Sequence, residues 1–148
     1  MQVKDMMTAS PRCCDPDDAA DAALTHMDEV ECGAVPVVDA DRRVVGIVTD
    51  RDILFGIRSN GGSLAGLTIA QCMTANPLTV GAEEDGDDVI RSLAARRVRR
   101  APVVDADGRL VGIVAQADVA VHVQDDGLVA AYLREISAAA PSEPAAER

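Results

Sequence analysis

The chain of 148 residues is long enough for one compact module with a substantial hydrophobic core. Its formal net charge of −11 at pH 7 argues against general nucleic-acid binding, which needs a basic surface, and requires any anionic ligand to find a local basic patch. No apolar run approaches the roughly 20 residues that cross a bilayer, and the N-terminus has no signal-like region, so we expect a cytoplasmic protein without a membrane partner.

The first half of the chain is predicted to mix short helices and strands. Residues 15–18 form a strong helix start, because Asp15 can cap a helix, Pro16 fits its first turn and acidic residues complement its dipole. Residues 40–42 separate two β-branched runs, which predicts a hairpin. The expected elements are a helical lead-in at 3–8, a strand at 12–14, a helix from 15 to about 29, strands at 35–39 and 43–49, and a helix at 50–58.

The second half is predicted to repeat this order after a linker. The linker signal is the run Ser-Asn-Gly-Gly-Ser at residues 59–63. The tail from Ala138 is rich in Ala, Pro, Glu and Ser, so we expect it to be disordered. The expected elements are a lead-in at 68–73, a strand at 78–80, a helix from about 83 to 96, strands at 101–105 and 109–115, a helix from 116, and an amphipathic helix at 127–136.

The two halves of the sequence match each other in a single register. A shift of 66 positions places Pro36-Val37-Val38-Asp39 on residues 102–105, and it places Asp52 on Asp118. Such a repeat implies two similar lobes related by a pseudo-twofold axis. We therefore divide the chain into a first motif (1–58), a linker (59–67), a second motif (68–124), a C-terminal helix (125–137) and a disordered tail (138–148).

The stretch at residues 44–53, Val-Val-Gly-Ile-Val-Thr-Asp-Arg-Asp-Ile, combines a buried strand with the chemistry of a binding site. Thr49 is the predicted N-cap of the helix that follows, since its hydroxyl can accept a hydrogen bond from an orphan backbone N–H. The strand thus ends in the Thr49 hydroxyl and the Asp52 carboxylate, beside free backbone amides. This arrangement suits a sugar hydroxyl and a phosphate.

The order of strand, helix, two strands and helix, with the motifs x-Pro-Val-Val-Asp and Gly-Ile-Val-x-x-x-Asp, resembles the CBS domain. Two such motifs in tandem are similar to a CBS pair, or Bateman module, of the stand-alone bacterial kind, and the resemblance covers roughly residues 1–124. It implies an α/β (α+β) fold of two pseudo-twofold-related CBS motifs. Each motif is then a small mixed three-stranded sheet with two helices on one face.

The resemblance implies a regulatory module that binds an adenosine-containing ligand in the clefts between the motifs and signals by conformational change. AMP, ADP or ATP is the expected ligand, with S-adenosylmethionine or NAD as further candidates, and no cofactor is expected. In the family, one motif supplies the hydroxyl and aspartate of its Gly-h-x-Thr/Ser-x-x-Asp stretch. The other motif supplies residues of its lead-in and residues just before x-Pro-Val-Val. Carried over, the first cleft comprises Ile47, Thr49, Asp52, Ile69, Ala70, Val98, Arg99 and Arg100.

The chemistry of these residue types supports the first cleft independently. A carboxylate can accept two hydrogen bonds from a vicinal diol, and Arg99 and Arg100 can bind a phosphate bidentately. Residues 96–100, Arg-Arg-Val-Arg-Arg, form the dense basic patch of this acidic chain. The alternative is a solvated helix end, where cations complement the helix dipole.

The second cleft departs from the family pattern. Asp118 is retained, but Ala115 stands where the hydroxyl should be, and no arginine pair is expected opposite it. Each loss should weaken a phosphate ligand by about 1–3 kcal/mol, so we expect the first cleft to be the occupied one. By the same carry-over, the second cleft comprises Val3, Lys4, Cys32, Gly33, Ile113 and Asp118.

Other function classes are weighed against this hypothesis. A nucleotide-free interaction or scaffold module with empty clefts would use its apolar helix faces and the segment around Tyr132. An enzyme is disfavoured because the sequence has no nucleophile–base pair, metal cluster or P-loop, and its four cysteines lack zinc spacing. CBS pairs commonly form homodimers through the helices after the hairpins, so we expect a homodimer. The apolar residues Ile53, Leu54 and Ile57 fit such a contact, and they fit packing within the monomer equally well. An effector protein of unknown identity is expected to read out the conformational change.

Overall fold

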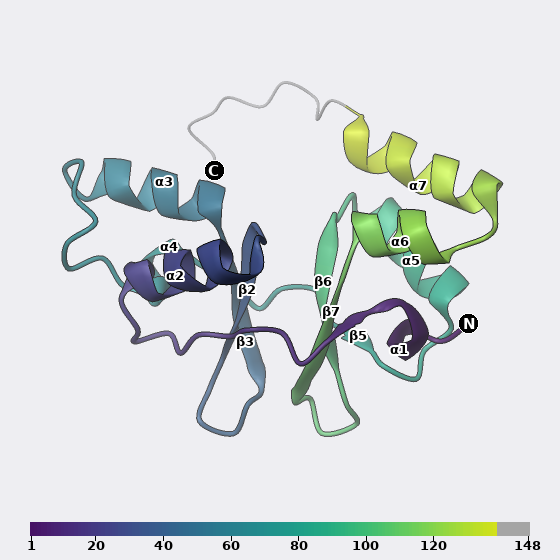
Figure 1. Ribbon diagram of the computed structural model, residues 1–148, viewed down its shortest axis with the longest axis horizontal. Coiled ribbons are helices and arrows are strands. Elements are labelled where there is room, and N and C mark those ends of the chain that lie inside the picture. The colour runs from purple at the N-terminus through teal and green to yellow at the C-terminus, as the bar shows by residue number, and fades with distance from the viewer. Residues whose placement is uncertain (139–148) are drawn as a thin grey trace.

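The computed structural model describes residues 1–138, which form two lobes that lie side by side (Figure 1). In chain order the elements are α1 (Val3–Met6), β1 (Thr8–Ala9), α2 (Ala20–Val30), β2 (Ala34–Val38), β3 (Val44–Thr49), α3 (Asp50–Ser59), α4 (Ile69–Cys72), β4 (Thr74–Ala75), β5 (Val80–Gly81), α5 (Gly86–Ala95), β6 (Arg100–Val104), β7 (Leu110–Ala115), α6 (Gln116–His122) and α7 (Asp126–Ser137). No helix among the described residues is long and apolar enough to cross a membrane.

The two halves of the chain exchange their lead-in strands. The first lobe is built on a sheet of order β2-β3-β4, and the second on a sheet of order β1-β7-β6-β5. Strand β1 comes from the first half yet pairs antiparallel with β7, while β4 comes from the second half and pairs antiparallel with β3. Each lobe therefore contains a strand from both halves, which ties the two repeats into one unit.

The predicted α/β class is confirmed, and the two sheets differ in size. The first has three strands, all antiparallel, in which β4 from the second half takes the place of the expected strand at 12–14. The second has four, because β5 and β6 form two parallel residue pairs. The counterpart of this pairing in the first lobe is a single parallel bridge between Cys14 and Val37. The strand expected at residues 12–14 is thus reduced to one bridge, and the strand expected at 78–80 lies at Val80–Gly81.

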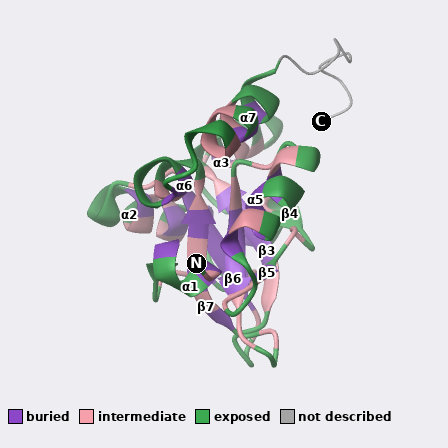
Figure 2. Cartoon of the chain, turned by 90° about the vertical axis from the view of Figure 1, so that its right-hand side faces the viewer, coloured by how far each residue is buried: buried purple, intermediate pink, exposed green. Residues whose placement is uncertain are grey.

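Each lobe has its own hydrophobic core, in which the lead-ins also take part. Figure 2 shows the buried residues gathered along the strands and on the helix faces that pack against them. Val3 and Met6 of α1 belong to the core of the second lobe, and Ile69 of α4 belongs to that of the first. The described residues include no buried charged side chain. The aliphatic composition predicted these cores, whereas the exchange of lead-ins between them required the structure.

Helices α2 and α5 begin later than the sequence predicts. The helix expected from Asp15 begins at Ala20, because Ala19 is extended and bridges to Thr68 while the backbone N–H of Ala20 donates to the Leu67 carbonyl at 2.8 Å. Residues 15–18 form a turn instead, in which the N–H of Asp18 donates to the Asp15 carbonyl. The same happens at α5, where the N-cap Asp85 bridges to Gln2. Pairing with the exchanged lead-ins overrides the local helix signal.

The other helices follow their predictions closely. Helix α3 begins at Asp50 after the N-cap Thr49, α6 begins at Gln116, and α7 covers the amphipathic segment predicted at 127–136. The predicted tail lies, from residue 139, outside the described residues. Between the lobes, the hairpins meet where the N–H of Leu110 donates to the Arg42 carbonyl at 3.0 Å.

Candidate ligand-binding site

A pocket of about 580 Å³ opens between the two lobes. The first lobe contributes the end of α2 and the start of β2, and the second contributes β1, the start of β6, the end of β7 and the start of α6. We call it the inter-lobe pocket. Its wall consists of residues 8–12, residues 30–34, Arg99, Arg100, Ile113 and residues 115–118.

Two arginines at the start of β6 give this pocket its positive charge. Arg100 pairs in register with Ala115 of β7, and its Nη1 lies 3.8 Å from the position that a Cβ atom would occupy at Gly33. Arg99 donates a hydrogen bond from Nη2 to the Ile136 carbonyl at 3.3 Å. Neither arginine forms a salt bridge with any described residue, whereas Arg12, also in the wall, pairs with Glu29 at 3.3 Å.

The carboxylate of Asp118 is held at the junction where β7 ends and α6 begins. Its Oδ2 accepts a hydrogen bond from the Ala115 backbone N–H at 2.8 Å. The bond fixes the side chain at the pocket wall and leaves Oδ1 without a hydrogen bond to the described residues. Asp118 can thus accept a hydrogen bond from a ligand hydroxyl while it caps the helix.

Small side chains at four wall positions leave the space that the pocket occupies. The 66-residue repeat places long or branched side chains at the corresponding positions of the other half of the chain. The small residues are Gly33, Ala34, Ala115 and Ala117. Their counterparts are Arg99, Arg100, Thr49 and Arg51.

The arginine pair lies in the cleft where the sequence did not place it. The expectation that no arginine pair faces Asp118 is wrong, because Arg99 and Arg100 line the inter-lobe pocket together with Asp118. The physical reason is the pairing of β6 with β7, which brings the start of β6 beside the start of α6. The Gln116 N–H, for example, donates to the Arg99 carbonyl at 3.0 Å.

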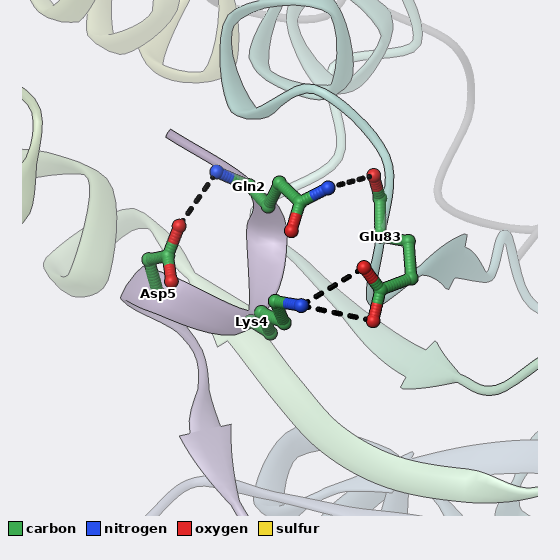
Figure 3. A network of polar contacts seen from close by, with 4 residues as sticks. All are labelled: Gln2, Lys4, Asp5 and Glu83. Atoms are coloured by element: carbon green, nitrogen blue, oxygen red, sulfur yellow. Dashed lines mark hydrogen bonds and ion pairs between the residues drawn. The ribbon is translucent and has the colours of Figure 1, made fainter.

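Four of the six residues predicted for the second cleft meet in this pocket, namely Cys32, Gly33, Ile113 and Asp118. Val3 does not, because it is fully buried in the core of the second lobe. Lys4 binds Glu83 through Nζ at 2.9 and 3.0 Å, beside the bond from Gln2 Nε2 to the Glu83 carbonyl (Figure 3). These contacts anchor α1 to the second lobe, and neither Val3 nor Lys4 lines the pocket.

The residues predicted for the first cleft do not come together in either of two hollows among the described residues. Thr49 Oγ1 accepts from the Asp52 N–H at 3.1 Å, and Asp52 Oδ2 accepts from the Thr49 N–H at 2.9 Å, so the pair forms a reciprocal helix cap. Asp52 lines a second hollow of about 1090 Å³, which lies along α3 and α4. Arg99 and Arg100 are not part of its wall. Neither hollow is lined by Ile47, Thr49, Ile69, Ala70 or Val98.

Sequence reasoning missed the lead-in residues of the pocket, among them Thr8, Ser10 and Arg12, as well as Glu31 beside Cys32. A signal for the lead-in was present. Met-Thr-Ala-x-Pro occurs at residues 7–11 and again at 73–77, in the register of the repeat. The repetition marks a segment with a shared structural role, which proved to be the exchanged strand at the pocket wall.

Two of the cysteines, Cys14 and Cys72, have raised pKa values and are therefore protonated thiols at neutral pH. Burial raises the pKa of Cys14 to about 11, with further increases from Asp18 and Cys13. Burial also raises the pKa of Cys72, and the Asp52 carboxylate adds to the effect. Among residues 1–138, no group of three or more His, Cys, Asp or Glu side chains is placed to hold a metal ion.

Comparison with known proteins identifies the fold of both lobes. A family model of the CBS domain matches residues 3–59 and again residues 69–125. The chain belongs to the CBS-domain family. It is 36% identical over 138 residues to the uncharacterized protein YlbB of Bacillus subtilis, a match that covers 92% of this chain and 91% of that one.

Two solved structures of CBS-pair proteins resemble the chain along most of its length. Hypoxic response protein 1 is known from Mycobacterium tuberculosis. Its crystal structure with two coordinated zinc ions has a TM-score of 0.73 at 31% identity, covering 83% of this chain and 99% of that one. CBSX2 is a CBS-pair protein from Arabidopsis thaliana. Its complex with AMP has a TM-score of 0.68 at 30% identity, covering 80% of this chain and 93% of that one.

Proposed function

We propose that this protein is a regulatory CBS pair that binds an adenine nucleotide in the inter-lobe pocket. The observation that carries the proposal is the position of Arg99 and Arg100, which line a pocket of about 580 Å³ without a carboxylate partner among the described residues. A chain with a net charge of −11 needs such a local basic site to attract an anion. The volume lies in the range of small-molecule sites.

The pocket offers a separate partner for each part of a nucleotide. The guanidinium groups of Arg99 and Arg100 bind the phosphate, since their planar N–H donors match phosphate oxygens. Asp118 accepts a hydrogen bond from a ribose hydroxyl through its free oxygen. Apolar wall residues such as Val30 and Ile113 pack on the adenine ring. The AMP complex of the similar protein CBSX2 supports the choice of AMP as the first ligand to test.

The charge of the pocket also ranks the other candidate ligands. S-adenosylmethionine carries no phosphate and offers the arginine pair a single carboxylate, while its ammonium and sulfonium groups add positive charge beside the two guanidinium groups. ADP, ATP and NAD also supply phosphates, so the choice between them and AMP depends on how much of each ligand the pocket can hold. We therefore place AMP and the other adenine nucleotides ahead of S-adenosylmethionine.

The test is isothermal titration calorimetry with AMP, ADP, ATP, S-adenosylmethionine and NAD on the wild type and a matched pair of variants. Asp118→Ala and Asp52→Ala each remove the carboxylate of an equivalent helix cap, so their structural costs are alike. We expect Asp118→Ala to weaken AMP binding about tenfold, whereas Asp52→Ala leaves it within about twofold. Loss of a charge-assisted pair in Arg100→Ala should weaken binding by about 10–100-fold.

Two results would overturn this assignment. Weakening by Asp52→Ala rather than Asp118→Ala would place the ligand in the first cleft, as the family pattern predicts. No heat with any of the five ligands would favour the alternative, a nucleotide-free interaction module. A blocking variant, Gly33→Leu, separates these cases: its first carbon makes only ordinary contacts, the nearest of them with Asp50 Oδ2 at 3.6 Å and Arg100 Nη1 at 3.8 Å. It should fold normally and reduce binding only if the inter-lobe pocket is the site.

We propose further that the protein acts as a homodimer and signals to an effector protein through a change in lobe or subunit arrangement. A ligand shifts such an equilibrium only through its different affinity for the two states. The surface that supports a dimer lies on the helices after the hairpins, where Leu54, Phe55 and Val121 are 68%, 45% and 77% exposed. Ile53, which the sequence also suggested for this contact, is only 1% exposed and packs inside the first lobe.

Sedimentation equilibrium at tens of micromolar tests the dimer. We expect a dimer for the wild type and a monomer for Leu54→Asp with Phe55→Asp, because burying two carboxylates in an apolar contact is costly. Thr25→Asp, an exposed substitution on α2, serves as the control and should stay dimeric. A monomeric wild type would exclude the dimer under these conditions.

A further inference from the structure

Helix α7 has no counterpart in the first lobe, and it packs against α5 of the second lobe (Figure 1). Its residues Leu128, Val129 and Leu133 contact the core, and Tyr132 is fully buried there. The amphipathic pattern alone accounts for this packing. It does not account for a set of polar contacts that α7 makes with residues 97–99, the segment that leads into β6.

Three consecutive residues of this segment are held by α7. Arg97 Nε lies 3.5 Å from Glu135 Oε2 in an exposed ion pair. The Tyr132 hydroxyl donates to the Val98 carbonyl at 3.0 Å. Arg99 Nη2 donates to the carbonyl of Ile136, in the last turn of α7, at 3.3 Å. The segment is thus fixed from the side of α7, while its last residue lines the inter-lobe pocket.

The Tyr132 contact is the firmest of the three. The ring is fully buried, and burial raises the pKa of Tyr132 to about 12 although the nearby Arg100 and Arg99 guanidinium groups oppose this rise. The hydroxyl therefore remains a donor over the physiological pH range. The bond to the Val98 carbonyl also places the phenol beside the residue that precedes Arg99 in the chain.

The Arg99 guanidinium can serve α7 and a ligand at the same time. Guanidinium has five N–H donors in a rigid fork, and one of them is used on Ile136. A cation at the C-terminal end of a helix is favourable, because the last carbonyls carry partial negative charge. The contact with α7 therefore orients the group without consuming the donors that a phosphate needs.

We propose that α7 is the positioning element of the arginine pair, with Tyr132 as its main positioning residue, and that nucleotide binding and docking of α7 stabilise each other. The coupling rests on the proposed function, whereas the positioning of residues 97–100 does not depend on a ligand. By linkage, a docked α7 raises nucleotide affinity by the same factor by which a bound nucleotide favours docking. The C-terminal helix is then the part of the chain whose stability reports on the pocket.

The experiment compares Tyr132→Phe with Val129→Ala by hydrogen–deuterium exchange and by AMP titration. Tyr132→Phe keeps the ring and removes only the hydroxyl, so it should fold. Val129→Ala loses packing on the same helix, and no polar contact with the segment involves this side chain. The two variants thus separate the hydrogen bond to Val98 from a general weakening of α7.

In the nucleotide-free proteins, we expect Tyr132→Phe to raise exchange at residues 97–100 about fivefold over Val129→Ala. We expect it also to weaken AMP binding about fivefold, while Val129→Ala stays within about twofold of the wild type; a net hydrogen bond of ordinary strength corresponds to these factors. In the wild type, saturating AMP should slow exchange at residues 126–137.

The outcomes separate the inference from the proposed function. If AMP binds equally to the wild type and Tyr132→Phe and leaves exchange of α7 unchanged, the coupling is overturned while nucleotide binding stands. If no nucleotide binds the wild type, the proposed function and the coupling fail together. The exchange of residues 97–100 without nucleotide then still decides the positioning role, and equal exchange in the two variants would overturn it.

Discussion

The strand–helix junctions at Thr49 and Ala115 have nearly the same backbone but different surroundings. Their φ and ψ angles are −110° and 162° at Thr49, and −130° and 167° at Ala115. In both, the aspartate three residues on accepts a hydrogen bond from the junction N–H, at 2.9 Å for Asp52 and 2.8 Å for Asp118. Yet only Asp118 lines the pocket that also contains the arginine pair.

This comparison shows that the aspartate of the motif has a local structural role in both lobes. Its presence alone therefore does not tell which cleft binds a ligand. The inter-lobe pocket is distinguished by what surrounds its aspartate, because the small residues Gly33 and Ala34 and the repeat-related Arg99 and Arg100 all line the same wall. The inter-lobe pocket combines small residues, which leave room, with the polar residues on which the proposed ligand binding rests.

The largest expected effect tests whether the two lobes depend equally on the exchanged strands. Gly46 of β3 and Gly112 of β7 each face the opposite lead-in, and a Cβ atom at Gly46 would lie 2.6 Å from Met73 Sδ and 3.1 Å from the Thr74 carbonyl oxygen. At Gly112 the corresponding contacts are Met7 and the Thr8 carbonyl. We expect Gly46→Val and Gly112→Val each to lower the free energy of unfolding by about 3 kcal/mol, measured by urea denaturation.

Gly33→Ala is the matched control, because its Cβ would make only ordinary contacts of 3.6 Å or more. It should change stability by less than about 0.5 kcal/mol. If either valine variant loses less than about 1 kcal/mol of unfolding free energy, the corresponding lead-in strand can shift at little cost. The two lobes would then not depend equally on their exchanged strands for stability.

Alkaline pH should destabilise the two lobes through different groups. Burial raises the pKa of Cys14 in the first lobe from 9.0 to about 11, and that of Tyr132 in the second from 10.0 to about 12. Since the unfolded chain ionises at the lower pH, the stabilisation is complete below the ordinary pKa and is lost as pH rises through the folded value. Each group should cost about 3 kcal/mol over its window of two pH units.

Urea denaturation at pH 8, 10 and 11.5 measures this loss. In Cys14→Ala, the loss of unfolding free energy between pH 9 and 11 should disappear. In Tyr132→Phe, the loss between pH 10 and 12 should disappear. Each variant is compared with its own stability at pH 8. A wild-type protein whose stability does not change from pH 8 to 11.5 would contradict the burial of both groups.

The smallest expected effect exchanges the two junction residues. Thr49 Oγ1 accepts a hydrogen bond from the Asp52 N–H, whereas the Ala115 side chain offers no acceptor to the first turn of α6. We expect Thr49→Ala to lower, and Ala115→Thr to raise, the free energy of unfolding by about 1 kcal/mol. Thermal unfolding at matched pH provides the measurement, with the double variant expected to return close to the wild-type value. Destabilisation by Ala115→Thr would show that the small residue is required at that wall by packing.

Local patterns predicted a large part of the fold. The hairpins follow from β-branched runs around turn residues, and α3 follows from Thr49 and Asp52, whose reciprocal cap involves only near neighbours. The strong start predicted at Asp15 failed because Ala19 and Ala20 bond to Thr68 and Leu67, which lie far along the chain. At the candidate site, Cys32, Gly33, Ile113 and Asp118 come together as the sequence grouped them, and Arg99 and Arg100, which the sequence assigned to the first cleft, line the same pocket.

The sequence by itself determined the repeat, the CBS family and the arginine patch, because these depend on residue order and on interactions between neighbours. Only the tertiary structure decided which lobe holds each lead-in, which residues line the inter-lobe pocket and where Arg99 and Arg100 lie. These features depend on pairing between distant segments, as between β1 and β7, and on the side-chain volume that remains once the lobes pack. The repeated sequence offers two related clefts, and packing decides which of their residues meet in the inter-lobe pocket.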